Sequence, residues 1–280
     1  MTLRAIIFSN LFIAAAATLF TREAYHLLQV EPRWSPLLAV VFFATLFVYN
    51  MDRLSSGSGE DRIEESPRHR WIHRHERVLQ VSAGVSLVAS AVGTLWLPLE
   101  VTLALIPLGV LALAYSLPVI PTRDRWLRLK DVPGLKVILI AVVWAGATGL
   151  LPAIETLEAP WNSGVVEGVV QMVGARALFI AGITLPFDIR DMERDARSGI
   201  ATVPLWLGVD WTRRIAVGCI VAFGLLNASH TPLVVSAVVT AGVVLAADRG
   251  RGELYYVAGL DGMMALQWAL VAGWPLLTAA

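Results

Sequence analysis

Charge and cysteine are both scarce in this chain of 280 residues. Only 16% of the residues are charged and 56% are hydrophobic, which is too apolar for an ordinary soluble domain of this length. The single cysteine, Cys219, excludes an internal disulfide framework and a thiolate metal site. The basic residues are interleaved with acidic ones and the net charge is zero, so nucleic-acid binding is not favoured. These shortages indicate an integral membrane protein.

The charged residues occur in clusters that are separated by long apolar runs. Each run approaches the roughly 20 residues that a helix needs to cross a hydrocarbon core. We therefore expect an all-α polytopic membrane protein with about nine transmembrane helices, to which the family resemblance given below adds a central cavity. The expected spans are residues 5–20, 36–50, 78–96, 101–118, 136–153, 168–186, 214–228, 232–247 and 255–277. A signal peptide is an alternative for the first run, although Asn10 is a poor residue for its apolar core.

The layout of the expected spans predicts one domain, residues 1–280, built from two four-helix halves and a final helix. The halves cover about 1–135 and 136–254. Short loops rich in lysine and arginine stay in the cytoplasm. With the N-terminus inside, all of the 22 basic residues except Arg22, Arg33 and Arg176 lie on the cytoplasmic side. We expect a multi-pass protein of an inner (cytoplasmic) membrane, with the N-terminus and the active-site loops in the cytoplasm.

Three aspartates follow the sixth expected span, in the segment DIRDMERDARSG at 188–199. Asp188, Asp191 and Asp195 are spaced so that a helix of 3.6 residues per turn projects them to one side. Three carboxylates that face one another repel unless a cation lies between them. Oxygen ligands without histidine or cysteine favour Mg²⁺, which is usually shared with substrate phosphates.

A plainer interpretation of the same segment is a solvated helix end. Its acids would then pair with the neighbouring basic residues Arg190, Arg194 and Arg197. Acidic residues at a span end that face the interior of a bundle are costly and tend to be functional. This setting favours the metal site.

A basic loop, AYSLPVIPTRDRWLRLKDVPGLK at 114–136, offers the complementary charge. Its side chains that could hold diphosphate oxygens are Arg123, Arg125, Arg128 and Lys130. Tyr115 could place its hydroxyl or its ring near a leaving group. The alternative is a basic cytoplasmic anchor with an interfacial tyrosine. Lys130 and Tyr115 are the residues that we favour.

The segment 49–77 is expected to hold the other half of the site. Asn50, Asp52 and Arg53 lie at the end of the second span, and Arg68 either faces phosphate or lies on the surface. The histidines of this segment do not share one helical face, and no HExxH order is present, so zinc is not favoured.

With these motifs in view, the chain resembles the UbiA superfamily of intramembrane prenyltransferases. The matching segments are DIRDMERDARSGIATVPLWLG at 188–208 and AYSLPVIPTRDRWLRLKDVPGLKVILIAVVWA at 114–145. The resemblance implies a helical bundle in which two aspartate motifs face each other across a cavity. It also implies two Mg²⁺ ions that bind a prenyl diphosphate, with the prenyl tail in a channel open to lipid.

The first motif departs from the family pattern NDxxDxxxD. Asn50 and Asp52 are present, but Ser56 stands where a second aspartate would fall. The first metal would then have fewer protein ligands, or it would recruit Glu60 or Asp61.

The expected activity is a Mg²⁺-dependent transfer of a prenyl group from a polyprenyl diphosphate to an aromatic or other lipophilic acceptor. The expected metal ligands are Asp52, Asp188, Asp191 and Asp195, the catalytic residues Asp191, Asp195, Lys130 and Tyr115, and the substrate-binding residues Asn50, Arg53, Arg68, Arg128 and Lys130. Two alternatives remain: a terpene cyclase of the same fold, and a non-catalytic membrane protein with a degenerate first motif. The oligomeric state is not predicted.

Overall fold

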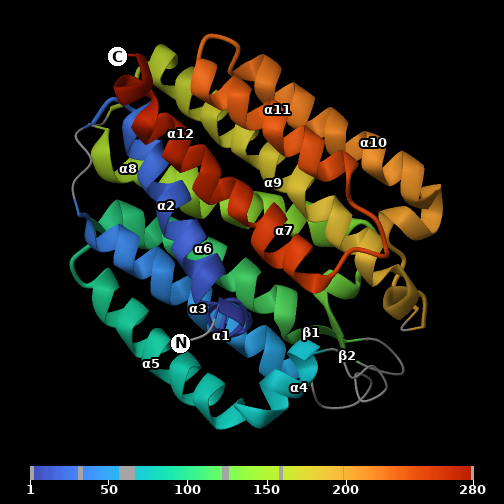
Figure 1. Cartoon of the computed structure of the whole chain (residues 1–280). Coiled ribbons are helices and arrows are strands. Elements are labelled where there is room, and N and C mark those ends of the chain that lie inside the picture. The colour runs from blue at the N-terminus through green and yellow to red at the C-terminus, as the bar shows by residue number, and fades with distance from the viewer. Residues whose placement is uncertain are drawn as a thin grey trace.

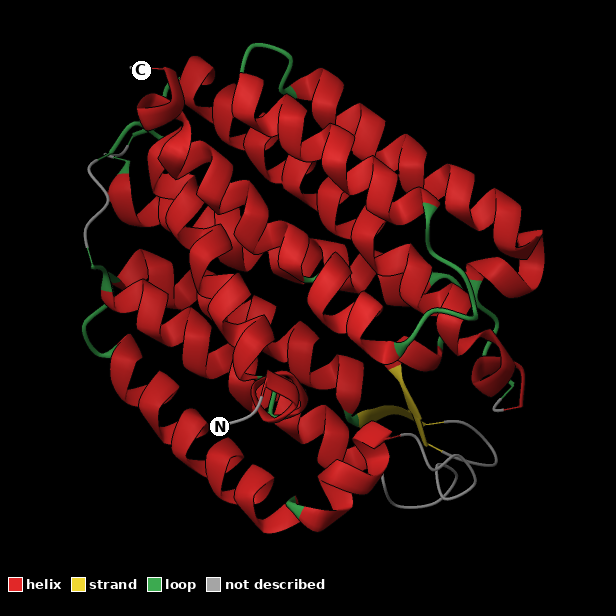
Figure 2. Cartoon of the chain, viewed as in Figure 1, coloured by secondary structure: helices red, strands yellow, loops and turns green. Residues whose placement is uncertain are grey.

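The structure, a computed structural model, describes residues 3–30, 34–56, 67–121, 126–157, 160–197 and 199–278. Almost all of its regular structure is helical (Figure 2). In chain order the elements are α1 (Leu3–Phe8), α2 (Leu11–Leu27), α3 (Pro36–Ser56), α4 (Pro67–Arg74), α5 (Glu76–Thr94), α6 (Leu99–Ser116), β1 (Pro118–Pro121), β2 (Trp126–Arg128), η2 (Leu129–Asp131), α7 (Leu135–Ala145), η3 (Gly146–Leu150), α8 (Leu151–Thr156), α9 (Ser163–Arg197), α10 (Val203–Leu226), α11 (Thr231–Leu245), η4 (Tyr255–Leu260) and α12 (Gly262–Thr278).

The long helices pack side by side in one bundle, as Figure 1 shows. Helix α2 contacts both α3 and α12, so the first long helix packs against the last one, while the two ends of the chain lie apart (Figure 1). Helix α9 contacts both α7 and α10. The expected all-helical membrane fold is confirmed, whereas the count of nine spans is not. Five segments have both the length and the hydropathy of a membrane span: 36–55, 76–94, 99–116, 135–156 and 163–197.

The outer surface of the bundle is apolar along α5 and α6. Val81, Val88 and Leu103 are each more than half exposed there. A soluble protein rarely exposes a contiguous apolar surface of this kind. Lipid contact accounts for it, because helices satisfy their backbone hydrogen bonds internally and can present apolar side chains to hydrocarbon.

The interior is filled by aromatic and aliphatic side chains from several helices. Phe179 on α9 lies between Phe20 on α2 and Phe223 on α10, with ring centroids 5.7 Å and 5.1 Å away. Such aromatic contacts add to the stabilisation from close packing. They fix α9 at the centre of the bundle.

The first expected span differs from the structure. Instead of one run at 5–20, the chain forms α1 and then α2, which extends to Leu27. The break occurs at Asn10, whose φ of 64° lies in the left-handed region that asparagine tolerates better than most residues. Its side-chain amide is buried and hydrogen-bonded to other elements. These tertiary contacts explain a break that the apolar pattern does not show.

The sixth expected span, 168–186, forms part of a longer helix. Helix α9 continues without interruption to Arg197 and so includes all three aspartates of the second motif. The basic loop contains a short antiparallel pair of strands, in which β1 pairs with β2 (Figure 2). This hairpin precedes η2 and α7, which carry the two lysines of the site described next.

Candidate functional site

The aspartates of α9 surround one lysine. Lys136, in the first turn of α7, places its Nζ 2.5 Å from Asp188 Oδ1 and 3.9 Å from Asp195 Oδ2. Lys136 also lies within electrostatic range of Asp191. Asp188 and Asp195 are buried, with 1% and 5% of their surfaces exposed. A cation therefore stands among the three carboxylates, as their mutual repulsion requires.

Asp191 has its own cationic partners. Arg190 binds it through two hydrogen bonds, Nε to Oδ1 at 2.8 Å and Nη2 to Oδ2 at 3.0 Å. Arg194 Nη2 lies 2.9 Å from Asp191 Oδ2. The pairing with neighbouring arginines expected for a solvated helix end is thus seen at Asp191. Asp188 and Asp195 instead face Lys136 from another helix.

Asp52, near the end of α3, is bound to the second lysine of the site. Lys130 in η2 forms an ion pair with Asp52 Oδ1, and Ser116 Oγ donates to the same oxygen at 2.9 Å. Burial lowers the pKa of Lys130, and the neighbouring Asp52 opposes that shift. Lys130 and Lys136 are the only lysines in the sequence, and each binds an aspartate of a different motif.

Tyr115 connects the two motifs. It lies near the end of α6, and its hydroxyl is within electrostatic range of both Asp52 and Asp188. Lys130 Nζ lies 5.3 Å from the centre of its ring. A small hollow is lined by both lysines, by Asp188 of the second motif and by the segment 200–203. Through Tyr115 and the two lysines, Asp52 and Asp188 lie on the same side of the bundle.

The side chains present have the chemistry of a Mg²⁺ site, since all the acidic ligands are oxygen donors. Asp195 Oδ2 is buried and has no hydrogen-bond partner among the described residues, which leaves it available to a cation. Within those residues, no three acidic, histidine or cysteine side chains are already gathered to hold a metal. Each carboxylate is instead paired with a lysine or an arginine. Metal binding would require these cations to move aside.

The other predicted residues have polar partners of their own. Arg128 is paired with Asp131 at 3.0 Å, next to Lys130. Asn50 is buried and donates to Ser82 Oγ at 3.1 Å. Arg68 is buried and lies 3.4 Å from Glu253. Four further candidates, Glu60, Asp61, Arg123 and Arg125, lie outside the described residues.

Sequence reasoning missed Lys136 and Arg190 as members of the site. Lys136 is counted there only as cytoplasmic charge, and Arg190 is counted as cytoplasmic charge and as a partner of the acids at a solvated helix end. The scarcity of lysine was the available signal. Both lysines of the sequence fall in one short segment, 114–136, and general membrane anchoring does not explain this concentration.

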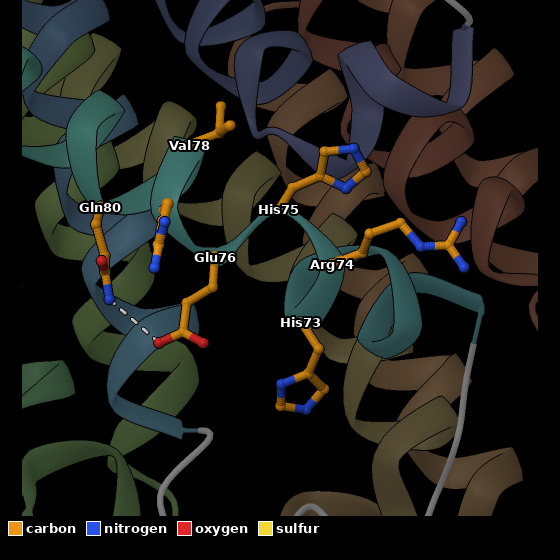
Figure 3. Close-up of a pocket in the computed structure, with 7 residues that line it drawn as sticks. His73, Arg74, His75, Glu76, Val78 and Gln80 are labelled. Carbon is orange, nitrogen blue, oxygen red and sulfur yellow. Dashed lines mark hydrogen bonds between the residues drawn. The ribbon is translucent and has the colours of Figure 1, made fainter.

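A second hollow, of about 370 Å³, lies on the surface where α4 meets α5. Figure 3 shows that His73, Arg74 and His75 point in different directions around it, while Gln80 is hydrogen-bonded to Glu76. The ring of His75 stacks on Trp71, with centroids 4.3 Å apart. None of the aspartates of the two motifs lines this hollow, so we place the functional site elsewhere.

Comparisons with known proteins show the family and the fold. A profile of the UbiA prenyltransferase family matches residues 60–251. A UbiA homologue from Archaeoglobus fulgidus, solved with GPP and Mg²⁺, is similar with a TM-score of 0.64 at 16% identity, over 95% of this chain and 98% of that one. The apo UbiA homologue from Aeropyrum pernix K1 gives a TM-score of 0.60 at 15% identity over the whole of both chains.

A structure of digeranylgeranylglyceryl phosphate synthase is also similar, with a TM-score of 0.56 at 13% identity, over 97% of this chain and 99% of that one. At these identities the structural likeness shows the fold. No curated protein matches the sequence. The profile covers well over half of the 280 residues, and the chain belongs to the UbiA prenyltransferase family.

Proposed function

We propose that this protein is a Mg²⁺-dependent prenyltransferase that moves a prenyl group from a polyprenyl diphosphate to an aromatic or other lipophilic acceptor. The observation that carries the proposal is the placement of both Asp52 and Asp188 near Tyr115, each bound to a lysine. Family membership supports it, as do the similar structures that hold GPP or DMAPP with Mg²⁺.

The metal would be held by Asp52, Asp188, Asp191 and Asp195. When bound, Mg²⁺ would neutralise diphosphate oxygens and stabilise the charge that develops on the leaving oxygen. The oxygen-donor set is consistent with this role, as is Asp195 Oδ2, which accepts no hydrogen bond from the described residues. Asp52 is the single aspartate of the first motif among the described residues. Its partner Lys130 adds positive charge beside it.

The side chains of the protein have separate tasks in the transfer. The bond between the prenyl carbon and the diphosphate oxygen breaks, and its electron pair stays with the diphosphate. Lys130 and Lys136 can exchange their carboxylate partners for diphosphate oxygens. Tyr115, which lies near both lysines, would orient the leaving group. Arg53 and Arg128 stand nearby to add positive charge. The acceptor carbon then forms the new bond and loses a proton.

We also propose that the site opens toward the cytoplasm from an inner membrane. The distribution of arginine and lysine supports this orientation, because nearly all of these residues lie in the expected inner loops. The apolar helices around the site would keep water away from a reactive allylic cation.

The test uses purified protein with Mg²⁺, geranylgeranyl diphosphate and a panel of aromatic and lipid acceptors. We expect a prenylated acceptor from the wild-type protein. We expect none from Asp191→Ala or from Asp195→Ala, when each variant remains monodisperse in detergent. Asp210→Asn is the matched control, since its side chain is 83% exposed on α10. A cyclic hydrocarbon from the diphosphate alone would identify a terpene cyclase instead. Full transfer by both aspartate variants would contradict the proposal.

A further inference from the structure

The junction of α4 and α5 lies at one end of a candidate membrane span. Helix α5, Glu76–Thr94, has the length and the hydropathy of such a span. A helix of this length rises about 28 Å, which is close to the thickness of a hydrocarbon core. The first turn of α5 therefore lies where the lipid headgroups begin. The surface hollow of about 370 Å³ lies at this level, between the end of α4 and the first turn of α5.

The rim of this hollow carries an excess of positive charge. Arg74 and Arg77 both line it, and both are exposed. Glu76 is the acid among the described lining residues, and its carboxylate accepts a hydrogen bond from Gln80 Nε2 at 3.1 Å. Figure 3 shows this pair on one side of the junction and Arg74 extending to the other. Within the described parts of the chain neither arginine forms an ion pair, so both guanidinium groups can bind an external anion.

The backbone that carries the two arginines is held by packing against the bundle. His75 separates α4 from α5, and its ring stacks on Trp71 with centroids 4.3 Å apart. The Nδ1 atom of His75 lies 2.9 Å from the carbonyl oxygen of Trp71. Trp71 in turn packs edge-on against Phe8 of α1, with centroids 6.1 Å apart. The hollow is therefore formed before a ligand binds, which lowers the cost of ordering.

A valine stripe, formed by Val78, Val81, Val85 and Val88, begins at the hollow and follows the outer face of α5. Its spacings of three and four residues place the four side chains on one side of the helix. They are 58–66% exposed, so the described chain leaves them largely uncovered. Val78 also lines the hollow, which makes the charged rim and the apolar stripe continuous. This combination matches an amphipathic molecule with an acidic head and a hydrocarbon chain.

We propose that the hollow at the α4–α5 junction binds the headgroup of an anionic phospholipid, with one acyl chain along the valine stripe. The lipid phosphate would accept hydrogen bonds from Arg74 and Arg77, because the planar guanidinium fork matches phosphate oxygens. A zwitterionic headgroup would bring a further cation to a rim that is already positive. The site is separate from the two aspartate motifs, none of whose aspartates lines the hollow, and it does not depend on the proposed reaction.

Native mass spectrometry of the purified protein in detergent measures the binding of individual lipids. The probes are phosphatidylglycerol and phosphatidylcholine with the same acyl chains, and inorganic phosphate is added as a competitor. A basic side chain near an anionic lipid surface is worth roughly fivefold in affinity, so two arginines should favour phosphatidylglycerol by about tenfold or more. Inorganic phosphate is expected not to displace the lipid, because it gains no contact with the valine stripe.

The discriminating variant is Arg74→Gln/Arg77→Gln, which removes two positive charges from the rim. We expect its preference for phosphatidylglycerol to fall below about threefold. The matched control is Arg214→Gln/Arg249→Gln, since these arginines are also exposed and do not line the hollow. The control should keep the preference of the wild type. Both double variants change exposed side chains, so in detergent without added lipid they should melt close to the wild-type temperature.

Equal binding of the two lipids by the wild-type protein would overturn the inference. An unchanged preference in Arg74→Gln/Arg77→Gln, or a loss of equal size in the control, would do the same. Displacement of the lipid by inorganic phosphate would show a simple anion site. A dimer that excludes phosphatidylglycerol would show that a second copy of the chain covers the valine stripe, and this result would also contradict a lipid site.

Discussion

At the scale of single residues, the site is built from acids that are neutralised by the protein itself. Lys136 stands among the carboxylates of α9, and Lys130 binds Asp52. A buried pair of charges is favourable only while both partners remain, and removing one leaves the other uncompensated. The lysines therefore stabilise the two motifs, and in the proposed reaction a metal and a diphosphate would take over their partners.

This arrangement predicts the effect of Lys136→Gln on stability. Without divalent metal, the variant should unfold more readily by roughly 3–5 kcal/mol, because Asp188 and Asp195 lose their cation. Addition of Mg²⁺ should raise its melting temperature more than that of the wild type. Thermal unfolding in detergent with EDTA or Mg²⁺ measures both effects. Lys136→Arg keeps the charge and serves as control. An equal response to Mg²⁺ in all three proteins would speak against the counter-cation role.

The lowered pKa of Lys130 predicts a pH dependence. Because burial disfavours the charged form, the ammonium group should lose its proton as the pH rises through a value below that of an ordinary lysine. The affinity for geranyl thiolodiphosphate, a donor analogue that resists ionisation, should therefore be highest at lower pH and fall on the alkaline side. Lys130→Arg should move this loss to higher pH, since arginine keeps its charge. Calorimetry across alkaline pH would show the difference, and identical profiles would contradict it.

The sequence alone predicted the residues whose chemistry is fixed by their type and spacing. Asp188, Asp191 and Asp195 lie on one helix, as a spacing of three and four residues requires. It did not predict which cation serves which acid, because that depends on how α7 and η2 pack against α9 and α3. Asn10 shows the same limit, since its role comes from contacts with Asn50 and Arg68, far away in the chain.

At the scale of elements, α9 is the helix that positions the site, and it packs closely on α10. A Cβ atom added at Gly182 would lie 2.6 Å from Ile220 Cδ1 and 3.0 Å from the carbonyl oxygen of Ala216. The two helices can approach in this way because glycine has no side chain, as at many helix contacts in membranes. The closeness of this contact holds the aspartate-bearing end of α9 in register.

Gly182→Ala is therefore expected to destabilise the protein by about 1–3 kcal/mol through overpacking. Gly174→Ala on the same helix is the control, because no atom lies within 4 Å of its added Cβ, and it should be neutral or slightly stabilising. Chemical unfolding of the two variants in matched detergent compares them. Equal stability would show that α9 and α10 are less tightly packed than described.

Element boundaries were predictable for some apolar runs and not for others. The runs that became α5 and α6 were expected within two residues at each end, whereas α3 begins at the expected residue 36 but continues beyond the expected end at 50 to Ser56. The continuation of α9 beyond 186 was not part of the expected span, because polar residues end the hydropathy signal while their helix propensity lets the helix continue. The division into two four-helix halves stays a prediction.

At the scale of the whole molecule, the orientation predicts which loops are reached from outside. Ser229, between α10 and α11, is expected outside, whereas Gly250, between α11 and η4, is expected in the cytoplasm. A cysteine introduced as Ser229→Cys should react with a membrane-impermeant maleimide in intact cells, and Gly250→Cys only after permeabilisation. The protein with Cys219 alone gives the background. The reverse pattern would invert the orientation and move the site to the other face.

The meeting of two motifs that are far apart in the chain is a property of the whole bundle. No local pattern shows that Asp52 and Asp188 share Tyr115 as a neighbour, and the expectation came from the resemblance to UbiA proteins. The packing of α3, α6, α7 and α9 produces it in the structure.

The most direct test of a shared site is the affinity for geranyl thiolodiphosphate with Mg²⁺, measured by calorimetry for Asp52→Asn, Asp191→Asn and the double variant. If both aspartates act on one metal and diphosphate unit, each single change should weaken binding by about tenfold or more, and the double variant should lose less than the sum of the two. Asp210→Asn should bind as the wild type does. Unchanged binding in Asp52→Asn, or strictly additive losses, would contradict a single site formed by the two motifs.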